Sequence, residues 1–76
     1  GARLLRIALQ NLPHSEVMMM NLCGLLIGQI RAEGRTDALV AEVMGLVERV
    51  RDVNPDNAKL RQYVQLIRSG GLQKQE

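Results

Sequence analysis

The chain is 76 residues long, which allows one small domain and makes the size of its core the limit on stability. A hydrophobic content of 46%, with only nine Pro and Gly residues, argues against disorder throughout. Because the sequence has no Phe and no Trp, helices packed through aliphatic side chains are favoured over aromatic-rich strands. The net charge is +2, from ten Lys and Arg against eight Asp and Glu. Because basic and acidic residues alternate along the chain, they indicate a solvated surface and not a continuous phosphate-binding stripe.

The first predicted helix covers residues 2–12. Its buried face is expected to consist of four apolar side chains: Leu4, Leu5, Ala8 and Leu12. Pro13 is expected to end this helix, because the residue before a proline disfavours the helical conformation.

A second helix is predicted from about residues 13–15 to Glu33. Glu16 would complement the positive end of its dipole, and Gly34 would cap its C-terminus in the left-handed region. Thr36 is then expected to cap a third helix. Because so few residues separate the two helices, we expect them to turn back on each other as an antiparallel hairpin.

The third predicted helix, residues 37–53, has the clearest amphipathic pattern in the sequence. Its apolar positions follow steps of four and three residues: Leu39, Val43, Leu46, Val50 and Val53. Asn54 is expected to cap a fourth helix with Pro55 at its first position, and this helix would run to about Ser69 before Gly70.

These elements predict an all-α fold: a small bundle of three long helices plus a short N-terminal one, built on the antiparallel hairpin. Residues 1–71 would form a single helical domain, and residues 72–76 are expected to be a flexible tail.

The stretch EVMMMNLCGLLIGQI, residues 16–30, carries no charge after Glu16. The uncharged run of residues 17–30 is shorter than the roughly 18–20 residues needed to span a bilayer, so no membrane span is predicted. On a helix its apolar side chains cover an arc of about 220°, whereas an outer helix of a monomer needs little more than about 100°.

Two interpretations of this wide arc remain open. Either the second helix is central and is wrapped by the other helices of its own chain, or part of the arc meets a second chain, as self-association or as docking of a partner's helix. In the second case the expected partner-binding residues are Met18, Met19, Leu22, Cys23, Leu26 and Ile30. Gly24 and Gly28, spaced as G-x-x-x-G, would permit close helix packing.

Catalysis and metal binding are not predicted. His14 is the only histidine and Cys23 the only cysteine, so neither a zinc site nor the separated base and nucleophile of a hydrolase is indicated, and no cofactor is expected. A lone cysteine in an apolar arc is typical of a packed thiol and fits a cytoplasmic or other reducing intracellular compartment.

The function that this pattern favours is a non-catalytic protein–protein interaction or oligomerisation module. The alternative is a small basic helical domain that binds nucleic acid or has a regulatory role, with Lys59, Arg61 and Arg68 on the fourth helix as its contacts. The sequence has no Phe and no Trp, and its one aromatic residue, Tyr63, is expected on the buried face of the fourth helix, so the lack of exposed base-stacking aromatics disfavours the alternative.

Overall fold

The computed structural model describes residues 1–69, and the predicted helix end at Gly70 and Gly71 and the predicted tail lie outside this range. The described chain consists of four α-helices: α1 (Ala2–Asn11), α2 (Glu16–Glu33), α3 (Asp37–Val53) and α4 (Ala58–Arg68). The all-α fold and the α2–α3 hairpin are therefore confirmed. The prediction of three long helices was wrong, because α2 and α3 have 18 and 17 residues whereas α1 and α4 have 10 and 11.

A side-chain cap begins each helix of the hairpin, and the cap by Thr36 was predicted. The Ser15 hydroxyl accepts a hydrogen bond from the Met18 N–H at 3.3 Å, and the Thr36 hydroxyl accepts one from the Leu39 N–H at 3.1 Å. Gly34 ends α2 with φ 115°, a value that favours glycine, but its ψ of 160° is extended and not that of a left-handed helical cap.

The start of α4 differs from the prediction. Asn57, and not Asn54, caps this helix, because its side-chain oxygen accepts the Leu60 N–H at 2.9 Å. Asn54 instead ends α3, and its side-chain oxygen accepts the Asp56 N–H at 3.2 Å, which holds Pro55 in a turn. The turn takes up residues that the prediction assigned to the helix, and α4 is short for that reason.

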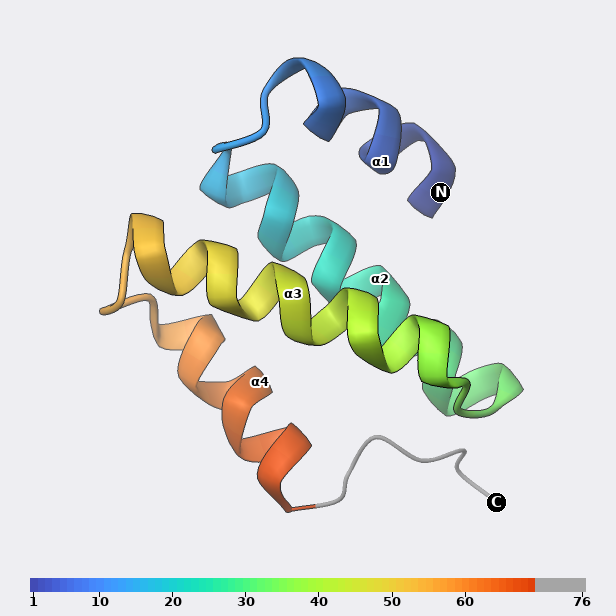
Figure 1. The fold of residues 1–76 in the computed structure, drawn as a ribbon. Helices are drawn as coiled ribbons and strands as arrows, with labels where there is room; N and C mark the ends of the chain where they lie inside the picture. The colour runs from blue at the N-terminus through green and yellow to red at the C-terminus, as the bar shows by residue number, and fades with distance from the viewer. Residues whose placement is uncertain (70–76) are drawn as a thin grey trace.

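The core lies between all four helices. Figure 1 shows α3 crossing α2, with α1 beside α2 and α4 beside α3, and these are the helix pairs with the most extensive contacts. Among residues 1–69, half of the twelve buried apolar side chains come from α2; the twelve are Leu9, Met19, Leu22, Cys23, Leu26, Ile27, Ile30, Val43, Leu46, Val47, Val50 and Leu60. The hairpin is therefore the framework on which α1 and α4 are placed.

Polar contacts fix α1 against the hairpin. The Arg6 guanidinium donates two hydrogen bonds to the Glu42 carboxylate of α3, each 2.8 Å long. This hydrogen bonding lowers the pKa of Glu42 and raises that of Arg6. Within residues 1–69, no helix combines the length and the apolar character needed to cross a membrane.

Candidate functional site

The structure places most of the predicted partner-binding residues inside the single chain. Met19, Leu22, Cys23, Leu26 and Ile30 are at most 2% exposed, and Met18 is partly buried. They face α3 and the inner sides of α1 and α4, so a partner could reach the five buried side chains only if the bundle opened. The wide apolar arc of α2 is thus largely used for the core of its own chain.

The opposite side of α2 is the one that the described residues leave exposed. Steps of three and four residues align Val17, Asn21, Gly24 and Gly28 along α2, and we call this line the outer strip. Val17 is 70% exposed, and Asn21 and Gly28 are also exposed. The outer strip is therefore a row of mostly small or short residues that faces away from the core.

The two glycines of the strip have different surroundings. A Cβ atom on Gly24 would lie 2.9 Å from the Tyr63 hydroxyl oxygen of α4, so this glycine already accommodates a side chain of its own chain. A Cβ atom on Gly28 would have no such neighbour within 4 Å. Of the two positions predicted for close packing, only Gly24 has a packing partner within the described residues.

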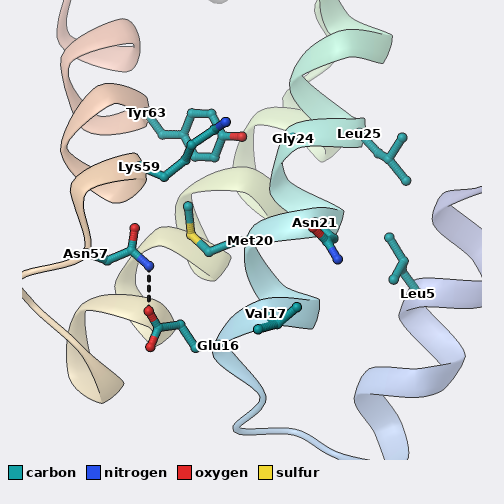
Figure 2. A pocket seen from close by; sticks show the side chains of 10 residues that line it. All are labelled: Leu5, Glu16, Val17, Met20, Asn21, Gly24, Leu25, Asn57, Lys59 and Tyr63. Atoms are coloured by element: carbon teal, nitrogen blue, oxygen red, sulfur yellow. Dashed lines mark hydrogen bonds between the residues drawn. The ribbon is translucent and has the colours of Figure 1, made fainter.

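Val17, Asn21 and Gly24 of the outer strip form the floor of an open groove of about 730 Å³, and Gly28 lies outside the lining of this groove. Its lining residues come from three helices and the cap of α4: Leu5, Glu16, Val17, Met20, Asn21, Gly24, Leu25, Asn57, Lys59 and Tyr63. Figure 2 shows Leu5 and Leu25 on one side of the groove and Lys59 with Tyr63 on the other. One wall is therefore aliphatic and is formed by Leu5 of α1 and Leu25 of α2, whereas the other is aromatic and cationic and belongs to α4.

The two charged groups in the groove, Glu16 and Lys59, differ in whether they have a bonding partner among the described residues. The Glu16 carboxylate accepts hydrogen bonds from the side-chain amides of Asn54, at 3.0 Å, and of Asn57, which ties the start of α2 to the turn before α4 (Figure 2). The exposed Lys59 ammonium forms no ion pair with any residue in the range 1–69. The groove thus contains an engaged carboxylate at one end and an unpaired cation on its α4 wall.

Neither Cys23 nor His14 forms a chemical centre with its neighbours. Burial raises the pKa of the Cys23 thiol to about 11, so the thiol is neutral at pH 7 and packs as a small apolar side chain. Burial, and secondarily the charge of Cys23, also raises the pKa of Tyr63. His14 is exposed in the turn before α2, and among the described residues no three His, Cys, Asp or Glu side chains gather as metal ligands do.

The three predicted nucleic-acid contacts do not share a face. Lys59 lines the groove beside α2, whereas Arg61 and Arg68 line a separate shallow depression together with Arg51 of α3. Two residues advance an α-helix by about 200°, so the separation of Lys59 from Arg61 could have been derived from the sequence. The contribution of Arg51 could not, because it depends on how α3 and α4 pack.

Sequence reasoning also missed most of the groove. Leu5 was expected only as a buried residue, and Val17, Met20 and Leu25 were counted only as part of an apolar segment. The available signal was the position of Val17 on the same side of the helix as the small residues.

No protein-family model, curated protein or solved structure matches the chain, so function is inferred from the groove itself.

Proposed function

We propose that the chain is a non-catalytic protein-association module that receives its partner in the groove on the outer side of α2. The observation that carries this proposal is a concave surface, lined largely by apolar side chains, on the side of α2 that residues 1–69 leave open. Binding sites for other molecules are typically concave and mostly apolar with a few polar groups.

Exposed apolar side chains supply the driving force. Single exposed hydrophobic residues are common on soluble proteins, so the exposure of Val17 or Leu25 alone would mean little. Here Val17, 70% exposed, and Leu25, 46% exposed, line the same groove, and Leu5 lies on the same side of it as Leu25 (Figure 2). At roughly 1.5–3 kcal/mol for full burial of each side chain, covering the exposed parts of Val17 and Leu25 would contribute about 2–3 kcal/mol.

Site-specific photo-crosslinking tests the proposal. A benzoylphenylalanine at Leu25 is expected to form a discrete, reproducible adduct with a protein in cells that express the chain, and Val17→Ser should weaken that adduct. The same crosslinker at Gln65, an exposed residue of α4 outside this groove, is the matched control. Adducts that are equally frequent at both positions, or absent from Leu25, would contradict a binding site in the groove.

Nucleic-acid binding is a second candidate, favoured by one observation. Arg51, Arg61 and Arg68 gather on one exposed side of the α3–α4 pair, and Asp56 lies 3.7 Å from Arg61 as a partial counter-charge. The only aromatic side chain, Tyr63, lies in the other groove, so stacking with bases is not provided here. Salt-dependent retention on duplex DNA that is lost on Arg61→Gln and Arg68→Gln would support this candidate.

A further inference from the structure

We infer that α1 is a detachable lid: it opens from the α2–α3 hairpin as one unit, about the turn at residues 12–15, while α2, α3 and α4 stay folded. In this device α1 is helical only when it is docked, so that opening and loss of the helix occur together. The ends of the four helices, the burial of α1 and the contacts that hold it all point to this behaviour.

α1 lacks the end signals that the other three helices have. Each of α2, α3 and α4 begins with a side chain that accepts a backbone N–H, and each has an arginine in its last turn. α1 begins at Gly1, which has no side chain to accept an N–H, and it has no acidic residue in its first turn and no basic residue in its last. Arg3 instead places a positive charge in the first turn, where it opposes the helix dipole.

The length of α1 adds to this intrinsic weakness. An isolated helix needs roughly 12–15 residues to be even marginally stable in water, and α1 has 10. With no end signal to offset its short length, α1 depends on packing against the hairpin for its helical state.

Packing holds α1 through little apolar surface. Leu9 is the one residue of α1 that the described chain buries, and Ala2 and Leu5 are partly buried against the core. Leu4 and Leu12, which the sequence predicted on the buried face, are 70% and 55% exposed. The other short helix, α4, also has one buried side chain, but four further apolar side chains of α4 are partly buried. Releasing α1 therefore gives up less burial than releasing α4.

The polar contacts that fasten α1 are exposed. The Arg6 guanidinium pairs with Glu42 across the gap between α1 and α3, and the two side chains are 43% and 31% exposed. In the turn before α2, the exposed Arg49 donates a hydrogen bond to the Pro13 carbonyl oxygen. Water replaces the partners of exposed groups at little cost, so these contacts orient α1 more than they hold it. The turn at residues 12–15 lies outside both helices and is the hinge.

Opening would uncover an apolar surface of the hairpin. Leu22 of α2 and Leu46 of α3, 2% and 3% exposed, line a depression together with Arg6 and Leu9 of α1, so removal of α1 would expose them to solvent. α1 also supplies Leu5 to the groove on the outer side of α2. The consequence for that groove rests on the proposed function: a partner that contacts Leu5 would bind only the closed form and would hold α1 in place.

Hydrogen exchange of the intact chain, resolved by residue with NMR, tests the lid. The measurement is made under conditions in which each opening reaches equilibrium before exchange. The amide protons of residues 5–12 are expected to share one protection factor, at least about tenfold lower than that of the core amides of α2 and α3. In Leu9→Ala, α1 should lose its protection while the core amides stay protected.

Asn57→Ala is the matched control. Asn57 caps α4 and donates a hydrogen bond to Glu16, and both contacts persist when α1 opens. The substitution should lower the protection of the core amides about fivefold to thirtyfold and leave the protection of α1 unchanged. If α1 instead loses protection as much as the core does in Asn57→Ala, α1 opens only with the whole chain and the lid is wrong.

Two further outcomes would overturn the inference. Protection that rises steadily from residue 5 to residue 12 would show fraying from the N-terminus and not opening as a unit. Loss of protection throughout the chain in Leu9→Ala would show that the hairpin does not stay folded without α1.

A thiol at position 22 reports whether opening uncovers α2. In Leu22→Cys, the new thiol is expected to react with a thiol reagent at least about tenfold faster than Cys23 of the same protein, which lies near Tyr63 of α4. Equal rates would contradict opening at α1. None of these measurements involves a partner, so their failure leaves the groove proposal standing, whereas crosslinking at Leu25 tests the groove without any opening.

Discussion

Replacing each of the two outer-strip glycines with alanine tests whether the strip is arranged as described. Alanine stabilises a helix interior by about 1 kcal/mol relative to glycine. At Gly28 the new methyl group would meet no neighbour within 4 Å, so Gly28→Ala is expected to raise the free energy of unfolding by this full amount. For a domain of this size, 1 kcal/mol corresponds to an increase of roughly 4–8 °C in Tm.

At Gly24 the same substitution meets an obstacle. The new methyl carbon would lie 2.9 Å from the Tyr63 hydroxyl oxygen, so the tyrosine side chain must move. Displacing a side chain from its preferred rotamer costs about 0.5–1.5 kcal/mol. Gly24→Ala is therefore expected to leave the stability within about 0.5 kcal/mol of the wild type.

A double-mutant cycle isolates the cause. In Tyr63→Phe the nearest ring atom to the new methyl would be the Cζ at 3.9 Å, an ordinary contact, so Gly24→Ala should regain most of the helix-propensity gain. Urea unfolding followed by circular dichroism would then give a coupling free energy of about 0.5–1.5 kcal/mol between positions 24 and 63. Equal stabilisation at both glycines in the wild-type background, or no coupling, would refute the placement of Tyr63 over the strip.

Three further perturbations follow from particular contacts. Asn57→Ala removes the cap of α4 and a hydrogen bond to Glu16, so we expect a loss of about 1–2 kcal/mol in urea unfolding. Because the pKa of Glu42 is lowered by its pairing with Arg6, the pair stabilises the fold above about pH 4.3, by at most about 1 kcal/mol for such an exposed pair. This contribution should be lost as the pH falls below that value. It should be absent from Arg6→Gln at every pH. Cys23, buried with a raised pKa, should react with a thiol reagent at pH 8 only when urea unfolds the chain, and rapid labelling of the native protein would contradict its burial.

The hairpin could be predicted because its signals are local. Thr36 as a cap, Gly34 as a helix end and the spacing of Val43 and Leu46 each depend on residues a few positions away. The start of α4 could not be predicted in the same way, because two asparagines, Asn54 and Asn57, are equally good caps. The side-chain amides of Asn54 and Asn57 both donate hydrogen bonds to Glu16, which is about forty positions earlier in the chain. These contacts accompany the start of α4 at Asn57, and they depend on the packing of α2 against the turn, which local sequence does not reveal.

The candidate site was predicted only in part. The width of the apolar arc indicates that α2 has more than one packed side, but it does not say which side the other helices cover. The predicted contacts Leu22 and Leu26 and the predicted close-packing residue Gly28 lie on opposite sides of one helix, so a single interface could not have used all of them. Helix geometry alone would have separated the core side from the outer strip.

The cost of glycine in a helix raises the question of what each helical glycine of this chain is used for. Gly24, Gly28 and Gly45 each forgo about 1 kcal/mol relative to alanine. The Tyr63 hydroxyl accounts for Gly24, whereas Gly28 and Gly45 both face open space. Gly45 lies in a depression beside Arg6 and Glu42, which already satisfy each other. Gly28 instead continues the outer strip past the residues that line the groove, on the side of α2 that the described residues leave exposed, so a partner that lay in the groove and extended along α2 would meet it.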